Sequence, residues 1–247
     1  MTQSEFYNEE FYKFRNESTR YAADTILGIV INTLPHINSA ADVGCGVGTW
    51  LAVVRKRGVE NVRGFDGPWV NKDLLEIPYG SFEMCNLEKP INSEHRFDLA
   101  ISLEVAEHLP ELAATNFIES LTKLADFVLF SAAIPYQGGV NHLNEQWQSY
   151  WAEKFALHGY LATDPVRPRI WEDKNISIPY RQNIILYVKK SRILDVKASV
   201  CECNSLSRAH PDLYMLRNTK SVMQSLRDLC KCLARKYRIL KEQSRPS

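Results

Sequence analysis

Three alternate glycines, at positions 44, 46 and 48, constrain the fold of this chain more than any other feature. A short apolar run ends at Val43, directly before them, and apolar residues recur at helical spacing from Trp50 to Val54. This order predicts a strand, a tight turn and a helix. Glycines in such a turn let a ligand approach the main chain more closely than a Cβ atom permits, and the N–H groups that begin the helix point to the same place. We therefore expect a cofactor with a polar or anionic group over Gly44–Gly48.

Apolar runs alternate with helical patterns along most of the chain. Helices are predicted at 18–34, with Ser18 as its cap, and at 112–124 and 147–158. Further strands are predicted at 60–67, 81–85, 97–103, 127–133 and 181–188. The alternation is typical of an α/β protein with a parallel, doubly wound sheet. Ligands of such sheets bind beyond the carboxyl ends of the strands, which places the polar loop 134–146 at the active face.

The glycine spacing also separates two classes of cofactor. Dinucleotide-binding turns follow the pattern Gly-x-Gly-x-x-Gly, and this chain has Thr49 where the third glycine would stand. The stretch Asp42–Gly48 instead resembles the first motif of class I S-adenosylmethionine-dependent methyltransferases. The segments 103–109 (Leu-Glu-Val-Ala-Glu-His-Leu) and 141–146 (Asn-His-Leu-Asn-Glu-Gln) resemble those of bacterial methyltransferases that tailor sugars, polysaccharides or small molecules. The resemblance covers about residues 20–190. It implies a mostly parallel, seven-stranded, Rossmann-like sheet with an antiparallel closing strand.

The same resemblance implies which residues hold S-adenosylmethionine. Asp42 would orient the turn and the methionine end of the cofactor. Asp66 stands 20 residues beyond Gly46, at the end of a predicted strand, where doubly wound folds place a carboxylate for ribose hydroxyls. An aspartate that only caps the turn before Gly67 is the structural alternative. The remaining cofactor contacts are expected at Cys45, at Asn86, where the family often has an aspartate near the adenine edge, and at Leu87, Leu103 and Glu104.

Methyl transfer also needs a group that takes a proton from the acceptor. A methyl sulfonium is already activated, so the enzyme mainly aligns donor and acceptor and removes that proton. His142 is the leading candidate for this base, because an imidazole with a pKa near 6.5 suits proton transfer at neutral pH. Glu145 on the same loop and His108 after the predicted strand 97–103 are the further candidates. A loop histidine that only bonds backbone or substrate is the alternative.

A divalent metal is a second way to activate the acceptor. Glu104, Glu107 and His108 share one face if a helix begins at residue 104, and His142 would add a fourth ligand. A similar Glu-x-x-Glu-His grouping is a metal site in the small-RNA 2′-O-methyltransferases. We expect no metal here, because Glu104 can contact the cofactor, while Glu107 and His108 can bond the start of the next helix.

The chain divides into three predicted parts. An aromatic segment at 1–17 is either a lid or a helix packed on the core, residues 18–190 form the methyltransferase domain, and residues 191–247 form a basic helical extension. The extension holds 12 Lys and Arg against 5 Asp and Glu, and its apolar residues recur every seven positions from Leu216 to Leu240. Such a helix packs on its own domain, forms a homodimer or recruits a partner protein. Zinc is not expected there, because cysteines two positions apart on a helix face different directions.

Composition limits the remaining classes of function. The net charge of +1 gives no argument for nucleic acid, and no apolar run approaches the length of a membrane span. We expect a cytoplasmic enzyme that acts on a small-molecule or sugar substrate. The leading function is S-adenosylmethionine-dependent methylation of a small-molecule or glycan acceptor, most plausibly on oxygen. The alternatives are a nicotinamide-dependent dehydrogenase on the same fold and a non-catalytic interaction protein that uses the C-terminal helix.

Overall fold

The computed structural model describes residues 9–218 of the chain. Its contacts divide the chain into two units, Met1–Ala209 and His210–Ser247. In the second unit, residues 211–218 form helix α9 (Pro211–Asn218). Nearly all of the seven-residue recurrence and the first eight residues of the aromatic segment lie outside the described residues, so both stay predictions. None of the helices in the described range is long and apolar enough to cross a membrane.

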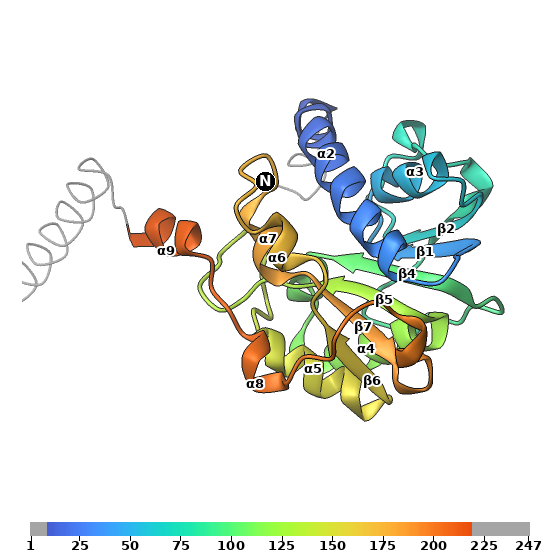
Figure 1. The fold of residues 1–247 in the computed structure, drawn as a ribbon. Helices are drawn as coiled ribbons and strands as arrows, with labels where there is room; N and C mark the ends of the chain where they lie inside the picture. The colour runs from blue at the N-terminus through green and yellow to red at the C-terminus, as the bar shows by residue number, and fades with distance from the viewer. Residues whose placement is uncertain (1–8, 219–247) are drawn as a thin grey trace, which may run out of the picture. The chain divides into compact units, whose positions relative to one another are not determined.

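The first unit is built on a seven-stranded sheet with the order β3-β2-β1-β4-β5-β7-β6 (Figure 1). Strands β1 to β5 run parallel to one another, and β7 is antiparallel to both of its neighbours, β5 and β6. The mostly parallel sheet and its antiparallel closing strand are confirmed. The strands are β1 (Ser39–Val43), β2 (Asn61–Asp66), β3 (Phe82–Met84), β4 (Phe97–Leu103), β5 (Ala125–Ser131), β6 (Tyr160–Thr163) and β7 (Ile185–Lys189).

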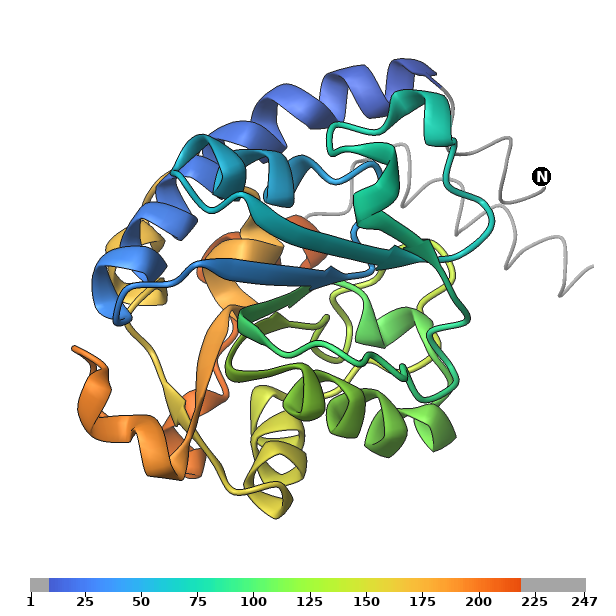
Figure 2. The same cartoon turned by 90° about the vertical axis from the view of Figure 1, so that its right-hand side faces the viewer.

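Helices cover both faces of this sheet, as Figure 2 shows. Residues of α2 and α3 contribute to the hydrophobic core of one face, and residues of α4 and α5 contribute to the core of the other. Covering both faces explains why β4 and β5 are apolar along nearly their whole length. The helices of this unit are α2 (Glu9–Thr33), α3 (Thr49–Lys56), α4 (Ala114–Leu124), α5 (Gln148–Leu157), α6 (Arg167–Ile170), α7 (Ile178–Asn183) and α8 (Cys203–Leu206).

Several element boundaries differ from the predicted ones. Helix α2 already begins at Glu9, so Ser18 lies inside the helix and does not cap it. The predicted strand 181–188 begins only at Ile185, because α7 includes residues up to Asn183. Pro179 lies in the first turn of α7, where its fixed φ favours a helix start. Strand β6 was not predicted. It is only four residues long, which is too short for a strand-like alternation of apolar and polar residues to be recognised after α5.

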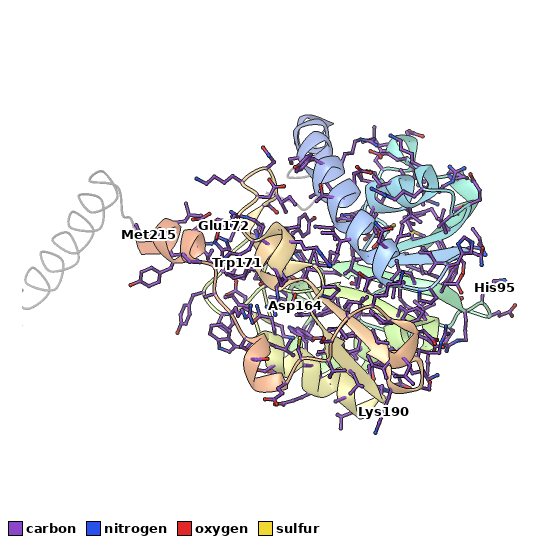
Figure 3. All side chains as sticks on the ribbon, viewed as in Figure 1. His95, Asp164, Trp171, Glu172, Lys190 and Met215 are labelled. Carbon is purple, nitrogen blue, oxygen red and sulfur yellow. The ribbon has the colours of Figure 1, made fainter. Side chains whose placement is uncertain are left out.

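A buried arginine joins the segments that follow β6. Arg167 pairs at 2.8 Å with Asp164, which is labelled in Figure 3. Only 1% of the Arg167 side chain is exposed. Its Nη1 donates to the carbonyl oxygens of Leu206, at 2.8 Å, and Gln182, at 3.2 Å. The charge is thus compensated inside the fold, as a buried guanidinium requires. The Arg167 side chain thus connects Asp164, Gln182 and Leu206.

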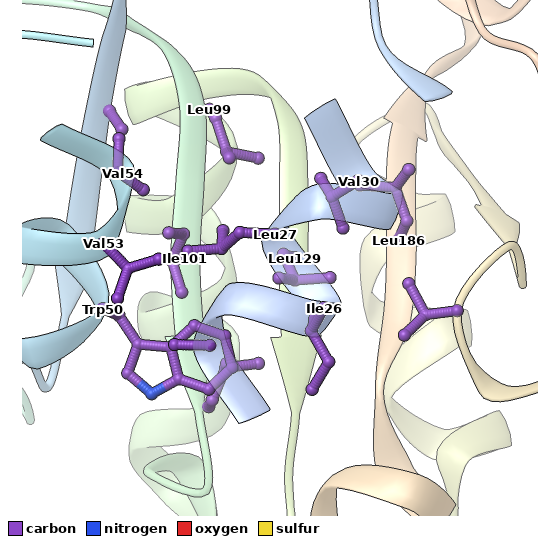
Figure 4. Close-up of a cluster of buried hydrophobic side chains, with 14 of the residues drawn as sticks. Ile26, Leu27, Val30, Trp50, Val53, Val54, Leu99, Ile101, Leu129 and Leu186 are labelled. Atoms are coloured by element: carbon purple, nitrogen blue, oxygen red, sulfur yellow. The ribbon is translucent and has the colours of Figure 1, made fainter. Parts of the chain in front are cut away.

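The core beneath α2 and α3 fixes both helices on the sheet. Figure 4 shows apolar side chains of the two helices meeting those of three strands. Full burial of one such side chain stabilises the fold by roughly 1.5–3 kcal/mol. The contacts fix the start of α3, and with it the turn that leads into α3. The labelled side chains are Ile26, Leu27 and Val30 from α2, Trp50, Val53 and Val54 from α3, and Leu99, Ile101, Leu129 and Leu186 from the strands.

Candidate active site

The glycine turn connects β1 to α3 as predicted, and its glycines serve different purposes. Gly44, Gly46 and Gly48 all have positive φ, at 84°, 54° and 87°. A Cβ added at Gly44 would lie 2.3 Å from the side chain of Val105, so this position allows close packing against the segment after β4. A Cβ at Gly46 would meet no atom of the described residues within 4 Å. The main chain at Gly46 is therefore accessible to a ligand.

Asp66 at the end of β2 is bonded to this turn. Its Oδ2 accepts a hydrogen bond from the Gly46 N–H at 2.7 Å, and its Oδ1 accepts one from the Gly67 N–H at 2.6 Å. Burial raises the pKa of Asp66, and the bonds from Gly46, Gly67 and the Trp69 side chain oppose that rise. The two readings of Asp66 are thus compatible: the carboxylate braces the turn, and it lies at the carboxyl ends of the strands, where ribose is expected.

Asp42 and Cys45 lie on either side of the start of the turn. Asp42 is 3% exposed, and its Oδ2 has no hydrogen-bond partner within the described residues. Burial, with the charge of Asp66, raises the pKa of Asp42 well above its ordinary value. A buried carboxylate oxygen without a donor fits a ligand that brings one. The Sγ of Cys45 instead packs against Gly64 of β2.

The other predicted cofactor residues occupy three kinds of environment. Asn86 is exposed, and its Oδ1 accepts the Glu88 N–H at 2.9 Å. Leu87 and Leu103 are buried in the fold. Glu104 has a φ of 55°, and its N–H donates to the carbonyl oxygen of Ser131 at 3.0 Å. This backbone conformation, rare for a residue with a side chain, turns the chain sharply after β4.

Two amides hold the carboxylate of Glu104. Oε2 accepts from Gln137 Nε2 at 2.9 Å, and Oε1 accepts from Asn183 Nδ2 at 3.1 Å. Glu107 lies beside it in a single 3₁₀ turn, η3 (Ala106–His108), and not in the first turn of an α-helix as predicted. Burial, and next the charge of Glu104, raise the pKa of Glu107 well above its ordinary value. The two carboxyls therefore differ: one accepts from two amides, and the other keeps its proton to higher pH.

His142 and Glu145 form a hydrogen-bonded pair on the loop after β5. His142 Nδ1 lies 2.8 Å from Glu145 Oε1. The same carboxylate accepts the N–H of Gly138 at 2.7 Å and the N–H of Tyr136 at 2.8 Å. Three contacts thus fix Glu145, which in turn fixes the imidazole. Because Nδ1 is engaged, Nε2 is the nitrogen available for a proton or a ligand.

His108 contributes to the same cluster. Its ring meets the ring of His142 edge to face, with 4.9 Å between the centroids, and its Nδ1 lies 3.3 Å from the carbonyl oxygen of Asn141. Glu107, His108 and His142 each offer one ligand atom, and these three atoms lie within 4.8 Å of one another. The Oε2 of Glu107 is buried with no hydrogen-bond partner in the described part of the chain.

A cleft of about 430 Å³ opens over these side chains. Its wall combines the segment after β4, the loop after β5, the middle of α2 and the start of α7. The lining residues include Ser18, Thr19, Ala22, Glu104, Glu107, His108, Gln137, Gly139, His142, Ser177 and Tyr180. The structure thus brings His108, His142 and Glu104 to one cleft, while the glycine turn and Asp66 lie at the ends of the neighbouring strands.

Sequence reasoning missed several residues of this region. Gln137 was within the predicted active loop, but nothing in its spacing marked it as a partner of Glu104. Asn183 was hidden because its segment was predicted as strand, and α7 brings it to the site. Pro179, which favours a helix start, was the one available signal. Tyr180 reaches the cleft through the same helix.

Comparisons with known proteins agree with this geometry. A family model described as "Methyltransferase domain" matches residues 21–161, more than half of the chain. No curated protein matches the chain.

Solved structures share the fold at low sequence identity. An O-methyltransferase family protein from Burkholderia thailandensis has a TM-score of 0.53 and 15% identity, over 73% of this chain and 58% of that one. This chain therefore spans less than two thirds of that protein. DesVI from Streptomyces venezuelae has a TM-score of 0.52 and 13% identity, over 73% and 95% of the two chains. Magnesium protoporphyrin IX methyltransferase from Synechocystis PCC 6803 with bound S-adenosylmethionine has a TM-score of 0.50 and 19% identity, over 70% and 80%.

These similarities agree with the enzyme class that the glycine spacing favours. The sheet order, the turn between β1 and α3, and the family match agree with each other and not with a nicotinamide-dependent dehydrogenase. The chain belongs to the methyltransferase-domain family, and it has the fold of class I S-adenosylmethionine-dependent methyltransferases.

Proposed function

We propose that this protein methylates a hydroxyl of a small-molecule or glycan acceptor, with His142 as the general base. The observation that carries the proposal is the hydrogen bond of 2.8 Å between Glu145 and His142, because His142 lines the cleft. Glu145 orients the imidazole through Nδ1 and stabilises its protonated form. Nε2 then takes the proton of an acceptor hydroxyl as the hydroxyl oxygen attacks.

The cofactor site of this proposal uses the residues at the ends of β1 and β2. S-adenosylmethionine supplies an activated methyl group when it is bound. The accessible main chain at Gly46 admits the cofactor, and the buried Asp42 oxygen accepts a hydrogen bond from its methionine end. Asp66 accepts from the ribose. The bond between Asp66 and Gly46 holds two of these three contacts in one arrangement before any ligand arrives.

The chemistry of the cleft supports a polar acceptor. Carboxylates, imidazoles and hydroxyls from four segments line it, among them Ser18, Thr19, Glu104, His108 and Ser177. Such a set pairs well with a molecule that carries several hydroxyls, because each buried hydroxyl needs a partner. This supports a glycan or a hydroxylated small molecule over a purely hydrocarbon acceptor.

A methyl-incorporation screen with labelled S-adenosylmethionine tests the proposal. Sugars, polysaccharide fragments and phenols serve as acceptors, and His142→Ala should lower turnover about 10²- to 10⁴-fold with little change in cofactor affinity. Glu145→Gln should lower turnover as well, because it removes the charge that stabilises the imidazolium. His95→Ala changes an exposed histidine and is the matched control. Full activity of His142→Ala would reject this base.

A divalent ion on Glu107, His108 and His142 is the second candidate. The closeness of the three ligand atoms and the unpartnered Glu107 oxygen favour it. Imidazole and carboxylate ligands suit a transition metal, which would bind and acidify the acceptor hydroxyl. His108→Ala and a chelator separate the two mechanisms. With His142 as the base, a chelator leaves activity unchanged. With a metal, the chelator abolishes activity, Mn²⁺ or Mg²⁺ restores it, and His108→Ala is as damaging as His142→Ala.

A further inference from the structure

The loop between β5 and α5 has an inverted distribution of polar and apolar side chains. The polar side chains of Gln137 and Asn144 are buried, with 5% and 3% exposed. Their apolar neighbours Tyr136 and Leu143 are 89% and 65% exposed. Folding normally buries the apolar member of such a pair, so exposed apolar side chains that gather in one loop indicate a binding surface.

Hydrogen bonds of the same loop fix the backbone that carries these exposed side chains. Glu145 accepts the Tyr136 N–H at 2.8 Å, and the backbone oxygen of Glu107 accepts the Leu143 N–H at 2.7 Å. Tyr136 also has a φ of 67°, a conformation that costs free energy in a residue with a side chain. The fold maintains this conformation although the phenol ring gains almost no burial from it, which favours a role in binding.

The exposed apolar surface is continuous with the cleft. Val140 lines the cleft and is still 49% exposed, so it belongs to both. Glu145, which holds Tyr136, also bonds His142 at 2.8 Å, and Leu143 directly follows His142. We call Tyr136, Val140 and Leu143 the apolar rim. A molecule that presents a hydroxyl to His142 can therefore contact the apolar rim where it leaves the cleft.

The interior of the cleft has the opposite character. Two carboxyls, two imidazoles and several hydroxyls line it, and the described lining residues include neither Lys nor Arg. A phosphate or carboxylate on the acceptor would thus meet Glu104 and Glu107 without a permanently charged cation to balance it. The interior is suited to an uncharged, hydroxylated group.

We propose that the acceptor is amphipathic: its uncharged, hydroxylated part enters the cleft, and an apolar part lies on the apolar rim. This inference rests on the proposed function, and it adds the substrate class and the residues that select it. The contact removes apolar surface of both partners from water. Because the apolar rim lies outside the reacting groups, it stabilises the bound acceptor and the transition state alike, so it acts on KM and not on kcat.

Three glucosides with the same sugar test the proposal on the full chain. The probes are methyl, phenyl and octyl β-D-glucopyranoside, all kept below the concentration at which octyl glucoside forms micelles, and calorimetry measures their binding. Phenyl or octyl glucoside should bind at least about 10-fold more tightly than methyl glucoside, since only these two carry apolar surface for the rim. Equal affinities of the three probes, or no binding of the phenyl and octyl probes, overturn the proposal.

Two variants test whether the apolar rim makes this contact. Leu143→Ser and Tyr136→Asn should each weaken binding of the tighter glucoside about 5- to 30-fold and leave methyl glucoside unaffected. Asparagine is chosen at position 136 because it tolerates a positive φ better than other residues. Circular dichroism and the thermal midpoint show whether each variant is folded. Unchanged affinity in both folded variants overturns the proposal.

Matched controls replace exposed apolar residues elsewhere on the sheet. Leu194 is 96% exposed in η5 (Lys190–Asp195), and Tyr79 is 68% exposed in η2 (Tyr79–Ser81). Segment η5 follows the antiparallel strand β7 and η2 precedes β3, so both lie away from the carboxyl ends of the parallel strands. Leu194→Ser and Tyr79→Asn should bind all three glucosides as the unchanged protein does.

Two further outcomes separate this inference from the proposed function. If an acceptor is methylated in a His142-dependent reaction and Leu143→Ser leaves its KM unchanged, the apolar rim is rejected and the proposed function stands. If His142→Ala keeps full turnover, the proposed base is rejected, while the glucoside affinities still decide the role of the rim. A dimer in sedimentation experiments that Leu143→Ser dissociates would show that a second copy covers the rim, and would reject the proposal.

Discussion

Gly139 lies against the imidazole of His142, on the side of the nitrogen that we assign to proton transfer. A Cβ added at this position would lie 2.1 Å from Nε2 and 2.4 Å from Cε1. The contact has a steric origin, since the φ of Gly139 is not in the positive range that restricts other residues. An alanine can therefore adopt this backbone conformation, but its methyl group competes with the ring for space.

Gly139→Ala should inactivate the enzyme without unfolding it. The methyl group forces the imidazole away from its position beside Glu145, so turnover should fall about as far as in His142→Ala, by about 10²- to 10⁴-fold. Affinity for S-adenosylhomocysteine, measured by calorimetry, should not change. Gly80→Ala is the control, since a Cβ there meets no described atom within 4 Å. Normal turnover in Gly139→Ala would show that the observed position of His142 is not the catalytic one.

Among single residues, the sequence predicted those whose role follows from their distance along the chain from a recognised motif. Gly46 and Asp66 were predicted from the distance between them, and they are hydrogen-bonded to each other. Gly139 and Asn183 were not predicted, because their contacts with His142 and Glu104 depend on which atoms the fold brings together. The roles assigned to His142 and Asp66 in catalysis and binding stay predictions.

At the scale of elements, the 3₁₀ turn η3 after β4 is hydrogen-bonded to the loop that follows β5. The backbone oxygen of Glu107 accepts the N–H groups of Leu143, at 2.7 Å, and Asn144, at 3.0 Å. One residue of η3 thereby holds the loop that carries His142. The side chain of Glu107 is buried beside the half-buried Glu104, so the protonation of Glu107 affects the stability of the fold.

Glu107→Gln should change how stability depends on pH. The unfolded chain ionises Glu107 near its ordinary pKa of 4.5, whereas burial and Glu104 keep it protonated to higher pH in the folded state. The folded state therefore holds the extra proton, and this group makes the free energy of unfolding fall as pH rises, until the raised pKa is passed. The variant lacks this loss, so its stability relative to the unchanged protein should rise by up to about 1.4 kcal/mol per pH unit in that window.

Urea unfolding at a series of pH values measures this difference. Glu119→Gln is the control, because Glu119 is half-exposed and its hydrogen bond with Lys123 lowers its pKa. A lowered pKa has the opposite sign, so this control should show no gain as pH rises. Parallel pH curves for Glu107→Gln and the unchanged protein would mean that Glu107 ionises in the folded state as it does in the unfolded one.

The elements that the sequence predicted well are long or strongly periodic. The strands β1, β2 and β4 and the helices α4 and α5 lie within about two residues of their predicted bounds. The segment from Tyr160 to Asn183 was predicted poorly, because its elements are only four to six residues long and tertiary contacts decide their form. The residues that α7 contributes to the site, Tyr180 and Asn183, were therefore not predicted.

For the whole molecule, the end of the folded unit matters for any shortened protein. Leu206 is fully buried in the core, and its carbonyl oxygen accepts from Arg167. A chain that ends at Ala209 should keep its unfolding transition and its affinity for S-adenosylhomocysteine. A chain that ends at Lys190 loses Leu206 and should be less stable by roughly 2–5 kcal/mol. Thermal unfolding of both chains measures this, and equal midpoints would show that the segment after Lys190 contributes nothing to the fold.

The bond between Glu104 and Asn183 spans 79 positions of the chain. A growing chain on the ribosome can complete β1, the glycine turn and β4 long before Asn183 has been synthesised. During that interval Glu104 lacks one of its two amide donors, and the cleft lacks the part of its wall that Tyr180 forms. The cleft that we propose for the acceptor is thus completed last. Premature termination before α7 leaves a polypeptide with the glycine turn but without the complete cleft.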